Sequence, residues 1–186
     1  FYNSVISKIF IESLQDFQLE NSLQKPSIEW SELIEAVKDG VVPVSPKLQL
    51  QYYKQGKAIV VFSGYNRHSA SVMFKGQHMF ILNRGALSRK PIEMYRIDPD
   101  KVTLDVIASI QEVCSKSAYQ FLHLTEDLAV SVAPEMSQSG VENQKDETCK
   151  SVETKGKQLG HQVMGNCSWA HLEAVVFAFL VTEIGN

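Results

Sequence analysis

The chain of 186 residues is 44% hydrophobic and has a formal net charge of −3 at pH 7, so it can bury one sizeable core but has no basic surface for nucleic acid. Its longest apolar run, 174–181, is too short to cross a bilayer. Because Phe1 is not a natural start, we expect a single domain over 1–186 that was cut from a longer protein, without a membrane span.

The cysteines of the chain are Cys114, Cys149 and Cys167, and no two of them form a CxxC pair. An odd number of unpaired cysteines argues against a disulfide framework and against a zinc site, and it favours a reducing compartment. We therefore expect no cofactor and no metal ion.

The first half of the chain is expected to form two helices followed by a series of strands. Apolar residues at helical spacing predict a helix over 1–24, and a second helix is expected after Pro26, with Ser27 as N-cap and Gly40 at its end. Strands are predicted at 49–53, 57–63, 68–74, 77–83 and 92–98.

In the second half, residues 104–114 fit an amphipathic helix, whereas 119–124 and 127–132 are compatible with either a strand or a helix. Residues 134–160 are polar, so we expect a mobile or functional loop there rather than core. A helix from about Cys167 to Ile184 ends the chain. This order predicts an α+β fold with helices at both ends and an antiparallel sheet between them.

A hairpin is predicted around the turn Lys75-Gly76, because glycine accepts the positive φ of a tight turn. In that register His68 lies opposite Asn83, and opposed residues of an antiparallel pair point to the same face. An imidazole and a carboxamide would then lie side by side at the open end of the hairpin. The asparagine could accept a hydrogen bond from one ring nitrogen and direct the other toward a thiol.

Cys167 lies where a glycine-containing turn becomes an apolar helix. The unpaired N–H groups and the positive end of the helix dipole favour a thiolate at that position, so Cys167 is the candidate nucleophile. Its alternative role is that of a buried cysteine that packs at the helix end.

His68 is the candidate base, since a positioned imidazole can take the thiol proton and later protonate the leaving group. Its alternative role is that of a sheet-edge histidine in contact with solvent. Asp98 is the alternative to Asn83 as the residue that orients the imidazole. The other histidines have less support as the base: His78, His123, His161 and His171.

The residues Gln162, Gly165, Cys167, Trp169 and Ala170, followed by the apolar helix, resemble the active-site segment of papain-like cysteine proteases. The chain order His, Asn, Gln, Cys is similar to that of the SUMO-protease and adenoviral-protease group. It is also similar to cysteine-protease effectors of intracellular bacteria such as Legionella, which include deubiquitinases and some ankyrin-containing effectors.

This resemblance implies a papain-like fold in which an antiparallel sheet packs against a central helix with Cys167 at its N-terminus. It implies Cys167, His68, Asn83 and Gln162 as catalytic residues, with the Gln162 amide and the Cys167 backbone N–H binding the oxyanion. The implied protein is a monomeric effector, secreted by a bacterium into the host cytosol. It would hydrolyse a peptide or isopeptide bond of a protein substrate, with ubiquitin-like conjugates as the most concrete case.

Two other functions fit the same residues. The cysteine and histidine would also serve an acyltransferase, a transglutaminase or a deamidase, which share the thioester chemistry and differ in the acceptor. A non-catalytic domain that binds a host protein would keep the fold and lose the chemistry.

Overall fold

The computed structural model describes the chain except residues 1–7, 10, 16–29, 42–43, 66–67, 86–89, 114–116, 136–144, 161–166 and 185–186. At 39–41, 158, 167–169 and 183–184 only the backbone is described. Four strands form one antiparallel sheet in the order β1-β2-β3-β4. The strands are β1 (Ile59–Tyr65), β2 (His68–Lys75), β3 (His78–Leu82) and β4 (Ile92–Arg96).

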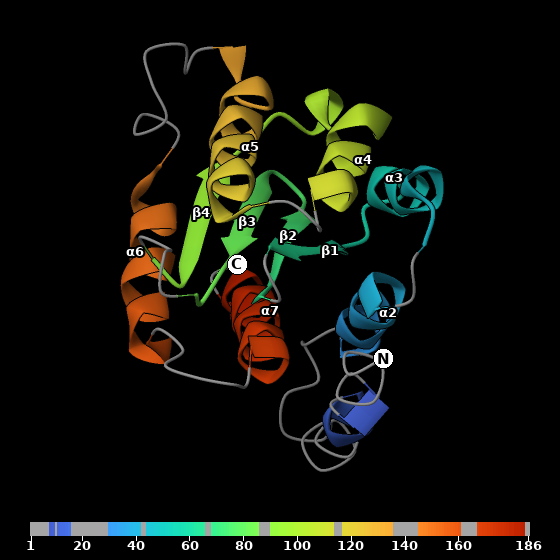
Figure 1. Ribbon diagram of the computed structural model, residues 1–186, viewed down its shortest axis with the longest axis vertical. Helices are drawn as coiled ribbons and strands as arrows, with labels where there is room; N and C mark the ends of the chain where they lie inside the picture. The colour runs from blue at the N-terminus through green and yellow to red at the C-terminus, as the bar shows by residue number, and fades with distance from the viewer. Residues whose placement is uncertain are drawn as a thin grey trace.

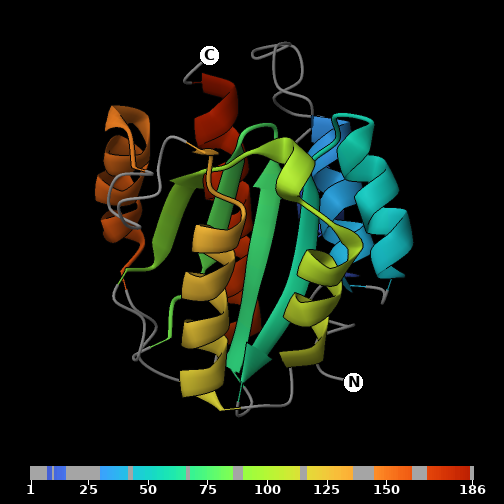
Figure 2. The ribbon, with the colours of Figure 1, turned by 90° about the horizontal axis from the view of Figure 1, so that it is seen from above.

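Helices cover both faces and both edges of this sheet (Figures 1 and 2). One face carries α4 (Leu104–Glu112) and α5 (Ala118–Ser131), and the other carries α7 (Cys167–Ile184). Beside β1 lie α2 (Trp30–Val41) and α3 (Pro46–Lys54), and beside β4 lies α6 (Glu147–Gly156). Short 3-10 turns are η1 (Pro99–Lys101) and η5 (Lys157–Leu159). Among the described helices, none combines the length and the apolar character that a bilayer span requires.

Each face of the sheet has its own hydrophobic core, because successive side chains of a strand point to opposite sides. Val72 and Met79 belong to the core under α4 and α5, whereas Met73 and Phe80 belong to the core under α7. All four side chains are fully buried. The central strands are therefore apolar along most of their length, as in other sheets covered on both faces.

The helix α7 runs alongside β2 in the same direction. His171, near its start, contacts Ser71 through an Nε2–Oγ distance of 2.9 Å, and Phe179, near its end, has the Lys75 ammonium 3.6 Å from its ring centroid. From His171 to Phe179 the helix advances roughly 12 Å, and from Ser71 to Lys75 the strand advances roughly 13 Å, so the two elements run side by side over this distance. The start of α7 and the start of β2 thus lie at the same end of the sheet (Figure 2).

The prediction of an α+β chain with an antiparallel sheet is confirmed. Four of the five predicted strands, the helix at 104–114 and the last helix are present with bounds that agree to within two residues. The second helix is α2, which extends one residue past Gly40. Of the first predicted helix, residues 8–9 and 11–15 are described and helical, whereas its remainder and the Ser27 cap lie outside the described residues.

The strand predicted at 49–53 is wrong, because these residues belong to α3. Ser45 caps this helix by accepting from the Leu48 N–H, and Pro46 occupies the first helical position, where its missing N–H costs nothing. Gln49 and Tyr53, four residues apart, are the buried residues of the helix. The ambiguous segments 119–124 and 127–132 form the single helix α5, which a capping box at its start stabilises.

The prediction of a loop over 134–160 is wrong for its second half, which contains α6. Asp146 caps the helix by accepting from the Cys149 N–H at 2.8 Å. The buried face of α6 consists of two small apolar residues, a glycine and one acidic residue: Cys149, Val152, Gly156 and Glu153. This face is only weakly hydrophobic, so the polar composition of the segment did not indicate a buried helix. Residues 136–144 lie outside the described part.

The predicted register of the β2–β3 hairpin is wrong by two residues. Lys75 pairs with His78, and Phe74 pairs with Met79, so the turn consists of Gly76 and Gln77 instead of Lys75 and Gly76. Gly76 does have a positive φ of 53°. Because side chains alternate with a period of two, a shift of two residues leaves every side chain on its predicted face.

Candidate active site

His68 and Asn83 form a hydrogen-bonded pair at the end of the sheet where β2 begins and β3 has ended. The His68 Nε2 lies 3.0 Å from the Asn83 Oδ1, which also accepts the Gly85 backbone N–H at 3.0 Å and the Tyr65 hydroxyl at 3.4 Å. Since an amide oxygen only accepts, the imidazole must donate from Nε2. The remaining ring nitrogen, Nδ1, then carries a lone pair and is the basic atom of the ring. The predicted contact between the two side chains is confirmed.

Asn83 is held firmly in this position. Its backbone N–H donates to the Pro91 carbonyl, and the residue is only 1% exposed. By alternation its side chain emerges on the same face as that of His68, although its neighbour along β2 is Ala70 when the observed register is extended by one residue. The pair is therefore a diagonal contact across the strands, which long side chains can make.

Gly85 is a site residue that the sequence analysis did not identify. A Cβ atom on this residue would lie 2.7 Å from the His68 Nε2 and 2.7 Å from the Tyr65 hydroxyl. No larger residue fits without displacing the imidazole. The sequence signal was a glycine two positions after Asn83, which on its own indicates only a turn.

The surroundings of His68 favour the neutral imidazole. Burial lowers its pKa, and the hydrogen bond that the imidazole donates to Asn83 opposes that effect. The Tyr65 ring lies with its centroid 5.0 Å from that of the imidazole and itself contacts Phe121 of α5. A neutral ring with its proton on Nε2 can accept a proton at Nδ1, which is what a general base requires.

Cys167 is the first residue of α7, as predicted, but its sulfur is not among the described side chains. Cys167 precedes His171 by one helical turn, and His68 precedes Ser71 by three strand residues, so both lie beyond the His171–Ser71 contact at the same end. These offsets are roughly 6 Å along the helix and 10 Å along the strand. Gln162 lies outside the described residues. The sulfur–imidazole distance and the oxyanion role therefore stay predictions.

A contact between the two halves of the predicted site would have to pass around the end of the sheet and not through it. Alternation along β2 places the His68 side chain on the face of α4 and α5, whereas α7 packs on the other face. The described β2–β3 ladder ends at the Ser71–Leu82 pair, which leaves His68 beyond it. Burial, with contributions from His68 and Arg84, lowers the pKa of His171 of α7 to about 3.

Arg84, the residue that follows Asn83, binds backbone groups on both sides of the segment that leads to Cys167. Its guanidinium donates to the carbonyls of Gly160 and Ala170, each at 3.1 Å, and to the Leu159 carbonyl. It also forms an ion pair of 2.6 Å with Glu173. Leu159 and Gly160 precede residues 161–166 in the chain, and Ala170 and Glu173 lie in the first two turns of α7. Arg84 is the second site residue that sequence reasoning missed.

We expect Arg84→Lys to lower the free energy of unfolding by about 2 kcal/mol, because a lysine cannot reach several carbonyls with one planar fork and would leave some of them unpaired. The Arg84 side chain is only 11% exposed, so water would not fully replace these bonds. Urea denaturation measures the change. Arg96→Lys is the matched control, since Arg96 is exposed on β4. An equal loss of unfolding free energy at both positions would show that the hydrogen bonds of Arg84 do not stabilise the fold.

The rival residues from the sequence are in other environments. Asp98 caps η1 by accepting from the Asp100 N–H, at the hairpin end of the sheet, where the Ile97 N–H donates to Gln77. His78 lies at that same end, and the His123 ring packs edge-to-face against Tyr119 of α5 with ring centroids 4.0 Å apart. Asn83, not Asp98, is therefore the partner of His68. His161 is outside the described residues.

Cys149 provides an internal contrast to Cys167. Burial raises the pKa of its thiol to about 12, and the neighbouring Asp146 carboxylate adds to that effect. The thiol is fully buried on α6. Cys149 is therefore protonated at neutral pH in the absence of a bound metal, although it too lies in the first turn of a helix.

The fold is thus an antiparallel sheet with a helix-borne cysteine and a histidine–asparagine pair at one end. No protein-family model matches the sequence, and no curated protein matches it. Among solved structures, the chain is similar to the Legionella effector AnkH, with a TM-score of 0.59 and 18% sequence identity. The similarity covers 96% of this chain and 38% of the AnkH chain. At this identity the likeness concerns the fold alone.

Proposed function

We propose that this chain is a cysteine hydrolase domain with Cys167 as nucleophile, His68 as general base and Asn83 as the residue that orients the imidazole. The observation that supports this proposal is the hydrogen bond from His68 Nε2 to Asn83 Oδ1, which leaves Nδ1 as the basic atom. A catalytic base needs a fixed tautomer and a third group that holds it. The start of α7 lies at the same end of the sheet.

The reaction would proceed in two steps that share one imidazole. The Cys167 proton first passes to His68 Nδ1, and the resulting thiolate attacks the carbonyl carbon of the scissile bond while the imidazolium donates its Nε2 proton to Asn83 Oδ1. The tetrahedral oxyanion accepts hydrogen bonds from the Cys167 N–H and the Gln162 amide. Collapse of the intermediate sends the Nδ1 proton to the leaving amine and forms a thioester. Water, deprotonated by the same nitrogen, then releases the acid and the thiol.

We further propose that the domain belongs to a bacterial effector that acts on a protein in the host cytosol. The structural similarity to a Legionella effector supports this assignment, as does the resemblance of the residues around Cys167 to papain-like proteases. The bond would be a peptide or isopeptide bond, with ubiquitin-like conjugates as the first substrates to test. This chain corresponds to less than half of the AnkH chain, so other parts of a longer protein would contribute to substrate choice.

The proposal predicts that iodoacetamide at pH 6 labels Cys167 much faster than Cys149. An ordinary thiol is about 0.3% ionised at this pH, whereas a thiolate paired with an imidazolium is largely ionised. Peptide mass spectrometry after short labelling times measures both rates in one sample. Cys167→Ser should remove the fast phase and leave the slow one. Equal rates at the two cysteines in the folded chain would reject the nucleophile and favour a binding domain.

The acyl acceptor and the substrate class need a second experiment. A ubiquitin probe with a C-terminal electrophile should form an adduct that Cys167→Ser abolishes. If Cys167 is reactive and no adduct forms, the deubiquitinase version fails and the hydrolase proposal stands. The mass change of a modified host protein then separates cleavage from acyl transfer, and from the gain of about one dalton that deamidation produces.

A further inference from the structure

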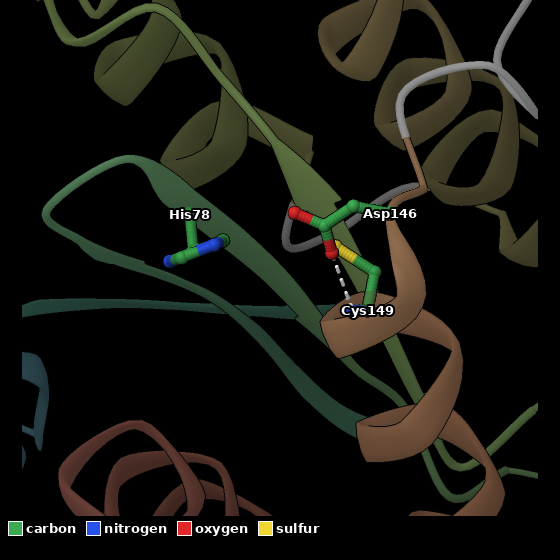
Figure 3. Close-up of side chains that lie close together, drawn as sticks. All are labelled: His78, Asp146 and Cys149. Atoms are coloured by element: carbon green, nitrogen blue, oxygen red, sulfur yellow. Dashed lines mark hydrogen bonds between the residues drawn. The ribbon is translucent and has the colours of Figure 1, made fainter. Parts of the chain in front are cut away.

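A second group of reactive side chains lies at the opposite end of the sheet from His68. His78 is the first residue of β3, Asp146 caps α6, and Cys149 lies in the first turn of that helix. Their ligand atoms all lie within 4.8 Å of one another. In Figure 3 the imidazole of His78 reaches from the strand toward the Asp146 carboxylate and the Cys149 sulfur at the start of α6.

N-capping and a hydrogen bond from the Cys149 thiol to the Asp146 carboxylate explain these two residues but not His78. One carboxylate oxygen of Asp146 accepts the Cys149 N–H at 2.8 Å, and a carboxylate has a second oxygen that can bind another group. Within the described part of the chain, the His78 ring nitrogens have no hydrogen-bond partner, although the ring is partly buried. A buried thiol and an imidazole that face one carboxylate form a donor set of nitrogen, oxygen and sulfur.

We propose that His78, Asp146 and Cys149 bind a zinc ion that joins the start of α6 to β3. Imidazole, carboxylate and thiolate are the three ligand types that zinc takes in proteins, and three protein ligands leave one tetrahedral position for water. Zinc–ligand bonds of about 2.0–2.3 Å bring ligand atoms to roughly 3.3–3.8 Å from one another. The observed spacing needs a contraction of roughly 1 Å, which rotation of the partly exposed His78 side chain can supply.

The charges around the group are mixed, and each affects the bound ion. Arg96 lies opposite His78 in the β3–β4 register and disfavours a dication. Glu153 lies one turn further along α6 and acts on Cys149, which favours a dication, although its carboxylate is paired with Lys145 and Lys90. Binding replaces the S–H bond of Cys149 with an S–Zn bond and releases one proton to solvent. Affinity should therefore fall as the pH is lowered.

Cobalt(II) tests the site directly because a thiolate ligand gives a sulfur-to-metal charge-transfer absorption in the near ultraviolet. The chain, stripped with a chelator and kept reduced, should develop this band with one equivalent of Co²⁺ and lose it when Zn²⁺ is added. Cys149→Ser should remove the band, and His78→Asn should weaken binding roughly tenfold or more. Cys167→Ser is the matched control and should keep the band.

Thermal unfolding provides a second readout that does not depend on the spectrum. Zn²⁺ should raise the unfolding midpoint of the chain and of Cys167→Ser, but not that of His78→Asn, whose partly exposed side chain makes its loss tolerable for folding. Absence of a charge-transfer band, or a band that Cys167→Ser removes and Cys149→Ser keeps, would overturn the proposal. Either result leaves the hydrolase proposal intact, because His68 and Asn83 lie at the other end of the sheet.

Discussion

His68→Gln should slow the alkylation of Cys167 at pH 6 by about 100-fold, because the thiol then returns from a largely ionised state to its ordinary pKa. Hydrolysis of any substrate should fall by about 10²–10⁴, the usual contribution of a positioned acid–base group. The labelling rate of Cys167 measured from pH 5 to 9 tests the first expectation. The variant should follow the ionisation of an ordinary thiol, whereas the wild-type profile should begin to rise at lower pH.

The lowered pKa of His68 is compatible with this role. Burial removes water from the ring, which disfavours the imidazolium, and Asn83 opposes that effect. A thiolate beside the ring would replace the missing water as the stabilising partner, so the two groups would titrate as a coupled pair. The imidazole is then neutral before the thiol proton arrives and charged afterwards.

Two further variants test whether Asn83 orients the His68 imidazole. Asn83→Ala removes the acceptor of the Nε2 proton and should reduce labelling less than His68→Gln does, since the base itself remains. Asp98→Asn is the matched control and should leave labelling unchanged, because Asp98 lies at the hairpin end of the sheet. A His68→Gln chain that is folded and labels at the wild-type rate would contradict the assignment of His68 as the base.

Glu153→Gln should lower the free energy of unfolding by about 3–5 kcal/mol, the cost of leaving a buried charge without its partner. Glu153 Oε1 lies 2.7 Å from the Lys145 ammonium, and Oε2 lies 2.6 Å from that of Lys90. The side chains of Glu153 and Lys145 are only 5% and 4% exposed. Glu93, 3.7 Å from Lys145, offsets part of the loss, so we expect the lower end of this range.

The same carboxylate makes stability depend on pH. Burial alone would raise the pKa of Glu153, but the bonds from Lys145 and Lys90 outweigh it and the pKa is lowered. A lowered pKa in the folded state means that the stabilisation is fully present above the pKa of the unfolded chain and is lost as the pH falls through the folded value. Glu153→Gln should therefore flatten the acid side of the stability curve.

Urea denaturation between pH 3 and 7 measures both effects. Glu147→Gln is the control, since Glu147 is on the same helix, 91% exposed at its side chain, and forms an exposed ion pair with Lys150. An exposed pair of this kind contributes little to stability. If the two variants behave alike, the buried pairs do not hold α6 against β4.

The sheet and one half of the site followed from periodicity alone. Alternation placed His68 and Asn83 on one face, and that result survived a register error because the error was an even number of residues. An error of one residue would have separated the two side chains. The sequence did not determine which two residues form the turn, since Lys75-Gly76 and Gly76-Gln77 both place a glycine in the turn.

The helices α3 and α6 were missed for a different reason. Their buried faces contain polar residues that specific partners satisfy: Gln49 donates to the Val60 carbonyl, and Glu153 binds two lysines. Hydropathy counts such residues as exposed. Only contacts between distant parts of the chain reveal them, and the same is true of Arg84, whose partners follow it by more than seventy residues. Likewise, a search for paired cysteines cannot detect a mixed group of side chains such as His78, Asp146 and Cys149, which comes together from β3 and the start of α6.

Asn83 and Arg84 are neighbours along the backbone, yet their side chains leave the sheet in opposite directions. The peptide unit between Asn83 and Arg84 thus connects the residue that binds the His68 imidazole to the residue that binds the start of α7. A shift of the Leu159–Gly160 carbonyls would be transmitted through the guanidinium to the acceptor that fixes the imidazole tautomer. The proposed hydrolysis should accordingly be sensitive to a protein that presses on Leu159 and Gly160, even without touching the reacting atoms.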